Sequence, residues 1–206
     1  MGAKSWWDRT DNRVLEGVLA LAALLFGVFG VLIPVLGVVG LIDPMDTRDV
    51  ELDVTTRVPG AVKPVTADYG MTLTGTDRAE LGFVHPDFGQ RLLLALPEIT
   101  GSLLLLFVLV LLLRMARTLR SGDVFVPKNA RRLSAIGLTV LVQSVLSPLL
   151  PAVTTALLVR GTDMADRVPF AVTLSGKYVL LALLVLALAE VFRQGTKLRA
   201  DTEGLV

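Results

Sequence analysis

The chain has 206 residues, of which 53% are hydrophobic and 19% are charged, and its mean hydropathy is +0.67. These values exclude an ordinary water-soluble globular domain. The formal net charge of +1 gives no indication of direct nucleic-acid binding, and the absence of cysteine excludes a disulfide framework, a thiolate nucleophile and a cysteine-based metal site.

Four apolar runs are each near or above the ~20 residues that a helix needs to cross ~30 Å of hydrocarbon. The sequence therefore predicts one membrane domain, an all-α bundle of four transmembrane helices. The predicted spans cover residues 14–42, 92–113, 133–159 and 170–192. The first span follows a basic N-terminus, as a signal peptide would. It is about twice as long as a signal core and lacks a small-x-small cleavage site, so we expect a retained signal anchor.

The distribution of basic residues predicts the orientation of these spans. Residues 1–13, 114–132 and 193–206 hold twelve Lys and Arg in 46 residues, whereas residues 43–91 and 160–169 hold seven in 59. The positive-inside rule therefore predicts cytoplasmic N- and C-termini and a cytoplasmic basic loop at 114–132. The loop at 43–91 is then extracytoplasmic.

The extracytoplasmic loop at residues 43–91 shows the alternation of strands rather than helical periodicity. Apolar and polar residues alternate over 50–55 and 71–74, and 81–83 is a shorter candidate. We expect a small antiparallel sheet, a β-rich cap, because two strands alone are marginal in water. Two interpretations remain open: a sensing or partner-binding surface, and a solvated cover for the helix ends. The acidic residues of the loop do not have the spacing of a known calcium loop, so no metal site is predicted.

Ionisable residues within predicted spans are costly, and function is their default hypothesis. The four in this chain are Glu16, Glu98, Lys177 and Glu190. Glu16 and Glu190 lie about one turn inside the cytoplasmic interface, where arginines can neutralise them in interhelical pairs.

The other two charged residues lie toward the extracytoplasmic side. Glu98 follows Pro97, which is a good place for the second helix to begin, at Ile99. Lys177 either lies about 10 Å deep in a helix that starts at Phe170, or belongs to a helix that starts near Ser175. A pairing of Lys177 with Glu98 is a further hypothesis.

Polar residues and prolines interrupt the third span. They are Gln143, Ser144, Ser147, Pro148, Pro151, Thr154 and Thr155. Such groups usually face neighbouring helices, where hydroxyls satisfy the carbonyls that proline frees. A kinked packing helix is therefore favoured over the broken helix of a transporter, because no inverted repeat is present. The glycines of the first span form no GxxxG pair, so the sequence identifies no specific dimer face. Homo-oligomer formation is therefore left as an open question.

Two stretches carry a family resemblance. The first reads Gly122-Asp-Val-Phe-Val-Pro-Lys-Asn-Ala-Arg-Arg-Leu133 with Ile136-Gly137 after it, and the second reads Leu188-Ala-Glu-Val-Phe-Arg-Gln-Gly195 with Leu198 and residues 201–206 after it. They resemble the G-x-P-F-x-x-x-N-x-x-R-L-x-x-I-G stretch and the ending of the bacterial domain-of-unknown-function family 2975, although Val124 replaces the usual proline. The resemblance covers essentially the whole chain and implies a four-span protein of the bacterial cell membrane with no attached activity. Members are often encoded beside a small helix-turn-helix regulator, which implies a regulatory cytoplasmic partner.

The basic residues of the cytoplasmic loop and tail lie on the same side of the membrane, so these two segments are a candidate surface for partner docking. The candidate residues are Arg117, Arg120, Phe125, Asn129, Arg131, Arg132, Arg193 and Lys197. The simpler interpretation, which we favour, is that the basic residues attract anionic lipid of the bilayer at ~1 kcal/mol each and set the topology.

The function predicted from the sequence is a non-enzymatic regulator or sensor that couples the outer loop to a cytoplasmic partner, such as a helix-turn-helix regulator. An accessory transporter subunit or small permease is the alternative. We expect neither an enzyme nor a cofactor, because the sequence contains no nucleophile–base pair, metal constellation or nucleotide motif.

The predicted topology is testable by cysteine labelling, since the chain has no native cysteine. Single cysteines at Thr74 and Ser121 are expected to react oppositely with a membrane-impermeant maleimide in intact cells, because they lie on opposite sides of the bilayer. Equal labelling of the two sites before lysis would contradict the topology, and labelling after lysis is the control for reactivity.

Overall fold

A computed structural model of the protein describes residues 6–43, 45–51, 65–66, 72–73, 78–120, 126–163, 165–166 and 168–203. The first span is a helical rod made of α1 (Trp6–Gly27), the π-helix η1 (Val28–Leu32) and α2 (Ile33–Val39). Three more long helices follow, α3 (Phe88–Arg120), α4 (Pro127–Val159) and α5 (Gly176–Glu203). The strands are β1 (Thr47–Glu51), β2 (Val65–Thr66), β3 (Thr72–Leu73) and β4 (Arg78–Gly82).

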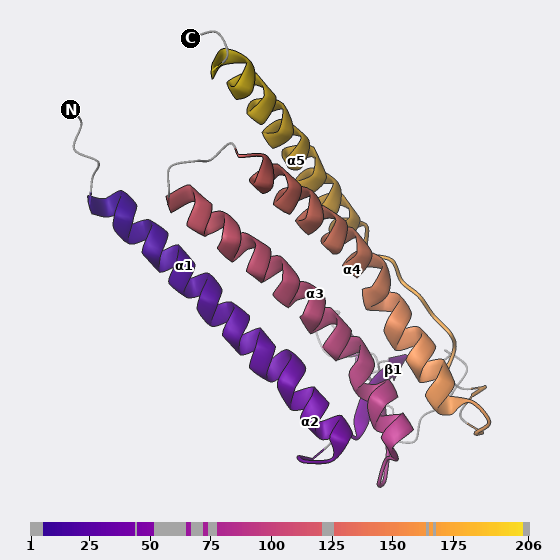
Figure 1. The fold of residues 1–206 in the computed structure, drawn as a ribbon. Helices are drawn as coiled ribbons and strands as arrows, with labels where there is room; N and C mark the ends of the chain where they lie inside the picture. The colour runs from indigo at the N-terminus through magenta and orange to yellow at the C-terminus, as the bar shows by residue number, and fades with distance from the viewer. Residues whose placement is uncertain are drawn as a thin grey trace.

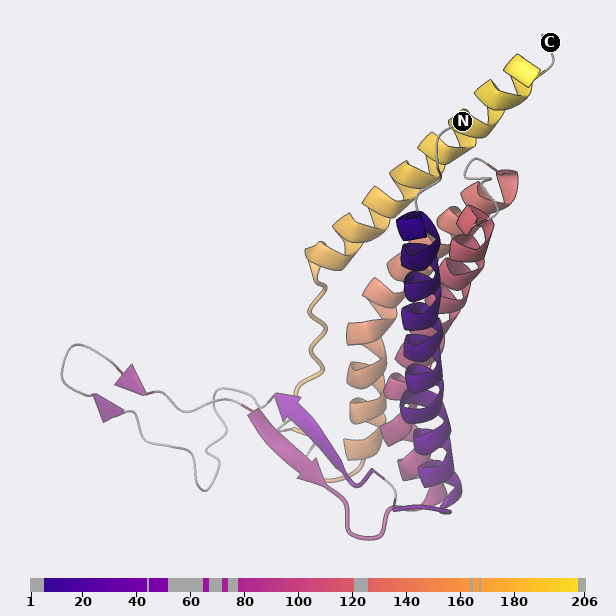
Figure 2. The same cartoon turned by 90° about the vertical axis from the view of Figure 1, so that its left-hand side faces the viewer.

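The long helices pack in the order α1, α3, α4 and α5 across the molecule (Figure 1). Both termini lie at one end, together with the end of α3 and the start of α4. We call this the basic end, because its described residues include Arg114, Arg117, Arg131, Arg132 and Arg193. The opposite end carries the paired strands β1 and β4 (Figure 2). We call this strand pair the hairpin, although β2 and β3 lie between its strands in the sequence, and we call this end of the molecule the hairpin end.

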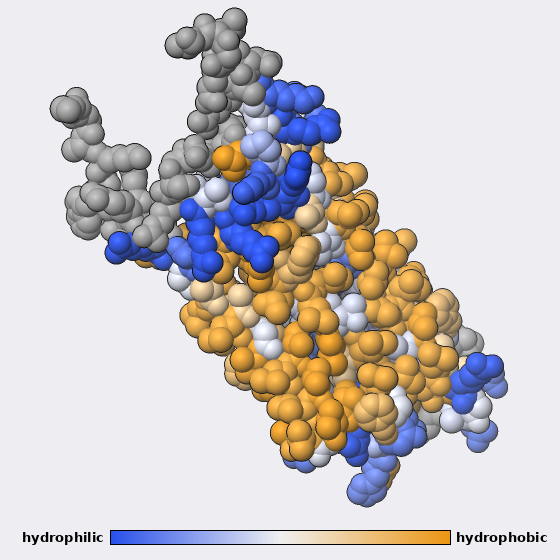
Figure 3. Space-filling model, viewed as in Figure 1, coloured by the Kyte–Doolittle hydropathy of each residue, from blue (hydrophilic) through white to orange (hydrophobic). Residues whose placement is uncertain are grey.

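All four helical segments are long and apolar enough to cross a membrane, which confirms the predicted fold class. Only 11% to 28% of the residues in their most apolar windows are buried inside the protein. The remaining apolar side chains form a broad hydrophobic band between two hydrophilic ends (Figure 3). A surface of this kind far exceeds the apolar patches of soluble monomers and fits lipid as its solvent.

Helix α3 begins at Phe88, four residues before the predicted span at 92–113, and the alternative start at Ile99 is wrong. The reason is a reciprocal cap. Asp87 Oδ1 accepts a hydrogen bond from the Gln90 N–H at 2.8 Å, and Gln90 Oε1 accepts one from the Asp87 N–H at 3.0 Å. This capping box satisfies the first free donors of the helix. Pro97 consequently lies inside α3, where it lacks the N–H that would bond to the carbonyl of Leu93.

Helix α5 begins at Gly176, so residues 170–175 of the predicted fourth span are extended. Val172 and Thr173 are β-branched, which favours an extended backbone over a helix. The extended segment at 168–175 runs beside the hairpin-end half of α4, and α5 then runs obliquely to the other helices toward the basic end (Figure 2). The helix from Gly176 to Leu198 is by itself long and apolar enough to cross a membrane, which agrees with the alternative start near Ser175.

The π-helix η1 directly precedes Pro34, which is buried. Proline removes a hydrogen-bond donor and crowds the preceding turn, and a wider turn is a common way to accommodate it. Gly30 of η1 lies against Ser102 of α3, where an added Cβ atom would overlap the serine side chain. This glycine lets the first span approach α3 closely.

The strands form two separate antiparallel pairs, β1 with β4 and β2 with β3. In the first pair Arg48 lies opposite Leu81 and Val50 lies opposite Ala79. The predicted cap is therefore β-rich and antiparallel, but it is divided into two-stranded units. Strand β1 begins at Thr47, three residues before the predicted alternation at 50–55, and residues 52–55 lie outside the described part of the chain.

The packed core lies toward the basic end, between α3, α4 and α5. Its buried members are Leu111, Leu133, Ile136 and Ala189. Gly137 of α4 lies against Leu186 of α5 so closely that an added Cβ atom would be 2.7 Å from Leu186 Cγ. These close contacts hold the three helices in a fixed register at this end.

Candidate functional site

Strand β1 directs one charged side chain toward the helices. Val50 is buried and Arg48 is half-buried, whereas Thr47, Asp49 and Glu51 are exposed. Because side chains alternate along a strand, Arg48 faces the same side as Val50. The sheet thus presents two acidic side chains to solvent and one guanidinium to the bundle.

The Arg48 guanidinium joins β1 to two helices. Its Nη2 donates hydrogen bonds to the carbonyl oxygens of Leu94 and of Leu93, the latter at 3.2 Å, both in α3. Its Nη1 donates to the hydroxyl oxygens of Thr154 and of Thr155 in α4, the latter at 3.4 Å. We call this set of contacts the Arg48 clamp.

The clamp forms where α3 has lost a backbone hydrogen bond. Pro97 has no N–H, so the carbonyl of Leu93 has no donor four residues further along the helix. Arg48 supplies the missing donor. In α4, Thr154 is 1% exposed and donates its own hydroxyl hydrogen to the carbonyl of Leu150 at 2.8 Å. The same oxygen is then free to accept from Arg48.

Burial lowers the pKa of Arg48 from its ordinary value, because desolvation disfavours the charged form. Arginine nevertheless stays protonated in proteins. None of the described carboxylates lies within 4 Å of its guanidinium, so carbonyl and hydroxyl dipoles compensate the charge. Such a site stabilises a cation only while all these acceptors keep their positions.

Arg48 is not among the site residues predicted from the sequence. It was counted among the basic residues of the outer loop, and the predicted strand began two residues after it. The usable signal is its spacing of two from Val50, which puts an arginine on the apolar face of the strand.

At the basic end a second polar network joins α3 to α4. Arg132 Nη1 donates to the carbonyl of Arg114 at 2.9 Å, to Thr118 Oγ1 at 2.8 Å and to Asn129 Oδ1 at 3.0 Å. Asn129 is 0% exposed. A partner therefore has no access to the Asn129 side chain in this arrangement, and the structure assigns Asn129 and Arg132 to the packing of α3 against α4.

The remaining docking candidates divide into paired and exposed residues. Arg117 Nε forms an interhelical ion pair with Glu16 Oε1 at 2.9 Å, and Arg193 pairs with Glu190 within α5 at 2.8 Å. Arg131 and Lys197 are exposed. Arg120 belongs to α3, and Phe125 lies outside the described residues.

The four ionisable residues of the spans have different environments. Glu16 is compensated between α1 and α3, as the interhelical hypothesis expected, whereas Glu190 is compensated within its own helix. Glu98 and Lys177 are exposed and form no ion pair with each other. Among the described residues no group of three or more His, Asp or Glu side chains is arranged to hold a metal ion.

Comparison with known proteins gives one family. The model of a family described as protein of unknown function (DUF2975) matches residues 63–206. No curated protein and no solved structure matches the chain.

Removing the Arg48 clamp is expected to destabilise the hairpin end. Arg48→Ala should lower the free energy of unfolding in detergent by about 2–3 kcal/mol, because hydrogen bonds from a charged donor are lost and the Leu93 carbonyl is left unsatisfied. Arg48→Lys should recover less than half, since an ammonium cannot span four acceptors on two helices.

Denaturant titration followed by circular dichroism measures these changes. Arg160→Ala, at the exposed end of α4, is the matched control and should fall within about 0.5 kcal/mol of the parent. A double-mutant cycle of Arg48→Ala with Thr154→Val should give a coupling of about 1 kcal/mol. A coupling of zero would contradict the clamp.

Proposed function

We propose that this chain, which belongs to the family of proteins of unknown function DUF2975, is a non-enzymatic membrane regulator that couples its extracytoplasmic hairpin to a cytoplasmic partner. The observation that carries the proposal is the Arg48 clamp, which ties β1 to α3 and α4 at once. The four helices that can cross a membrane supply the path between the two sides.

The clamp gives the hairpin a mechanical hold on the helices. A ligand or protein that displaces β1 must also move the guanidinium away from the carbonyls of Leu93 and Leu94. Proline positions such as Pro97 are where a helix bends most readily, because one internal hydrogen bond is missing. Displacement of Arg48 therefore acts on α3 at its most deformable point.

The helices are long enough to amplify a small bend. From Pro97 to Arg120 the helix extends about 35 Å at 1.5 Å per residue, so a bend of about 3° moves its far end by about 2 Å. Helix shifts of about 1–2 Å are sufficient for known switching transitions. The network of Arg132, Asn129 and Thr118 then carries the movement from α3 to α4.

The exposed cations of the basic end are the proposed docking surface. Lys128, Arg131 and Lys197 are exposed and have no described ion-pair partner. A partner with an acidic surface, such as the helix-turn-helix regulator that the family resemblance implies, fits these charges. Anionic lipid competes for the same residues.

A second candidate function, an accessory transporter subunit or small permease, is favoured by one feature of the hairpin end. The extended segment at 168–175 and α4 border a cavity of about 560 Å³, which Asp49, Glu51 and Arg160 also line. Irregular backbone at membrane depth is typical of water-filled cavities in transporters.

Coupling between the two ends is testable by spin labelling. Cysteines replacing Arg13 on α1 and Arg131 on α4, both exposed at the basic end, report the distance across the bundle. In liposomes, Arg48→Ala should shift the mean distance from double electron–electron resonance by about 2 Å or broaden its distribution, because the hairpin no longer restrains α3 and α4. Arg160→Ala is the control. Superimposable distributions in parent and Arg48→Ala would contradict the coupling.

The partner is testable by co-purification from native membranes. A cytoplasmic helix-turn-helix regulator should be recovered with the tagged chain, and Arg131→Glu with Lys197→Glu should reduce its recovery about tenfold. Arg160→Glu, a charge reversal at the opposite end, is the control and should leave recovery unchanged. Recovery of a transporter ATPase instead supports the second candidate, and recovery of neither contradicts both.

A further inference from the structure

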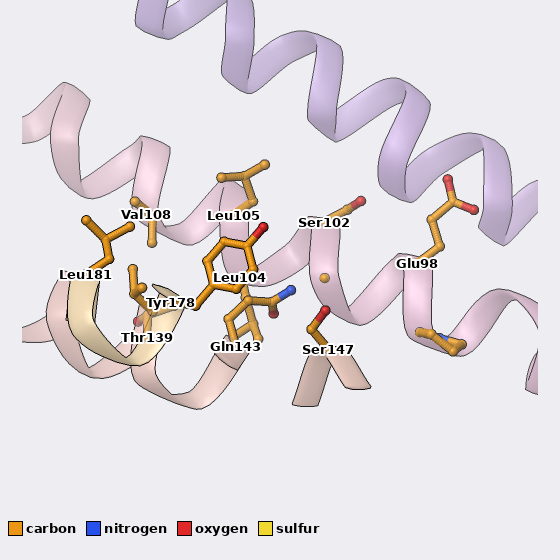
Figure 4. A pocket seen from close by; sticks show the side chains of 13 residues that line it. Glu98, Ser102, Leu104, Leu105, Val108, Thr139, Gln143, Ser147, Tyr178 and Leu181 are labelled. Carbon is orange, nitrogen blue, oxygen red and sulfur yellow. The ribbon is translucent and has the colours of Figure 1, made fainter. Parts of the chain in front are cut away.

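Two of the cavities in the molecule border α4, and they differ in polarity. One, of about 430 Å³, lies between α3, α4 and α5 and is lined mostly by apolar side chains, while Glu98 and Ser102 of α3 point away from it toward the first span (Figure 4). The other, of about 560 Å³, is bordered by β1, α4 and the extended segment at the hairpin end, and we call it the edge cavity. Its lining includes the carboxylates of Asp49 and Glu51 and the guanidinium of Arg160, so it is the better candidate for a ligand site.

The edge cavity lies along the free edge of β1. Asp49, Val50 and Glu51 all line it, whereas the described residues of β4 do not. Side chains of successive strand residues point to opposite faces of a sheet, so a cavity that touches three residues in a row runs along the edge of the strand. One edge of β1 is paired with β4, and the cavity therefore borders the other edge.

The register of the hairpin shows which backbone groups point to this free edge. The Phe83 N–H donates a hydrogen bond to the Asp46 carbonyl at 2.7 Å, which makes these two residues a hydrogen-bonded pair. Such pairs alternate along an antiparallel ladder, so every second residue of β1 after Asp46 bonds to β4 in the same way. Asp49 and Glu51 fall between those residues. Their N–H and C=O groups point away from β4 and bond to no other backbone group in the described part of the chain.

Another wall of the edge cavity also presents backbone groups. Residues 168–171 of the extended segment line it, together with Thr173. Residues 168–174 form no backbone-to-backbone hydrogen bond with other described residues. A peptide that enters the cavity therefore finds main-chain donors and acceptors on both of these walls.

The volume of the edge cavity fits a short strand. One strand residue takes up about 3.4 Å along the chain, about 4.8 Å across the sheet and about 10 Å between layers, or roughly 160 Å³. The cavity of about 560 Å³ thus accommodates about three residues. This length matches the part of β1 that borders the cavity, from Asp49 to Glu51.

The charges of β1 define the side chains that an added strand would carry. Asp49 and Glu51 are exposed, lie on one face of β1 and have no ion-pair partner among the described residues. The residues directly opposite them on an added strand lie on that face too, where Lys or Arg is favoured. The residue between these two faces the helices, as Val50 does. Several α4 residues that line the cavity are apolar, such as Pro148 and Ala152, so an apolar residue is favoured there.

We propose that the edge cavity binds an extended peptide segment of an extracytoplasmic partner protein, which adds to β1 as a third strand. The segment has a basic residue, an apolar residue and a basic residue in succession. Its backbone bonds to Asp49 and Glu51, and its basic side chains lie opposite the carboxylates of the same two residues. Main-chain hydrogen bonds supply affinity in this mode of binding, and the alternate side chains supply specificity. The inference concerns the hairpin end alone and does not depend on the proposed coupling to the basic end.

Fluorescence anisotropy tests the site with the full-length chain, one copy in each nanodisc of phosphatidylcholine. The neutral lipid avoids attraction of a basic peptide to an anionic bilayer. The probe is a fluorescein-labelled peptide of sequence Lys-Val-Lys-Val-Lys, which is expected to bind. Two matched peptides should bind about tenfold more weakly: one with Glu in place of each Lys, and one with the lysine backbone nitrogens methylated. Methylation keeps the charges and removes the donors that would bond to β1.

Two substitutions at one position separate the charge from the backbone. Glu51→Gln removes only a carboxylate and should weaken binding about threefold. Glu51→Pro also removes the N–H that points to the cavity, and should weaken binding about tenfold. Its unfolding midpoint should match that of the parent, because this N–H does not bond to β4. Glu80→Gln, at an exposed carboxylate of β4 outside the cavity, is the control and should leave the affinity unchanged.

Three results would overturn the proposal: no binding of the Lys-Val-Lys-Val-Lys peptide, equal binding of its methylated form, or equal affinity of the parent chain and Glu51→Pro. A second copy of this chain is the other occupant that the free edge could take. A disulfide between two Asp49→Cys chains in liposomes would assign the edge to that second copy, and it would overturn the proposal as well.

Discussion

The structure depends on one constraint, that backbone groups within an apolar band must find partners inside the protein. Prolines make this constraint acute, because each one leaves a carbonyl without its usual donor. Pro97 in α3 is one such proline. The free carbonyl of Leu93 receives a hydrogen bond from Arg48, a residue of a strand outside the helices. A defect in one helix thereby becomes the attachment point of the hairpin.

The same constraint explains the unusual fourth segment. Residues 168–174 form no backbone-to-backbone hydrogen bond with other described residues, so their polar groups need other partners. The adjoining cavity, lined by Asp49, Glu51 and Arg160, is polar and large enough to hold water that would supply them. The hairpin-end half of α4 thus borders this cavity on one side, while its basic-end half is packed against α5.

The four helices could be predicted from the sequence, whereas most of the polar contacts between them could not. Hydropathy measures the cost of placing a side chain in lipid, and four apolar runs are sufficient to predict four helices. Hydropathy does not register a capping box, so the start of α3 at Phe88 was missed although Asp87 and Gln90 have the required spacing. It also treats a loop arginine as solvated, which is why Arg48 was not identified.

At the basic end, the sequence does not distinguish residues that face outward from residues that pack between the helices. Asn129 and Arg132 are docking candidates in the sequence because both belong to the basic loop stretch that carries the family resemblance. The residues that carry the family resemblance instead pack: Leu133 and Ile136 belong to the core, and Gly137 admits Leu186. An asparagine spaced three residues before an arginine on one helix allows a mutual hydrogen bond, as Arg132 and Asn129 form here. That spacing can be read from the sequence. The contact of this pair with Thr118 cannot, because Thr118 lies on another helix.

The two ends of α3 and α4 therefore differ in how readily they release their contacts. Arg48 is half-buried, so water can solvate its guanidinium when the hairpin moves, and the main cost of release is the loss of a donor to the Leu93 carbonyl. Asn129 is fully enclosed, and its Oδ1 accepts hydrogen bonds from both Arg132 and Thr118, so a movement of α3 against α4 there disturbs several buried contacts at a higher cost. A displacement at the hairpin end is thus expected to bend the helices near Pro97 while the basic end moves as a unit. In the regulatory function that we propose, that asymmetry gives the coupling its direction, from the hairpin toward the exposed cations at Arg131 and Lys197.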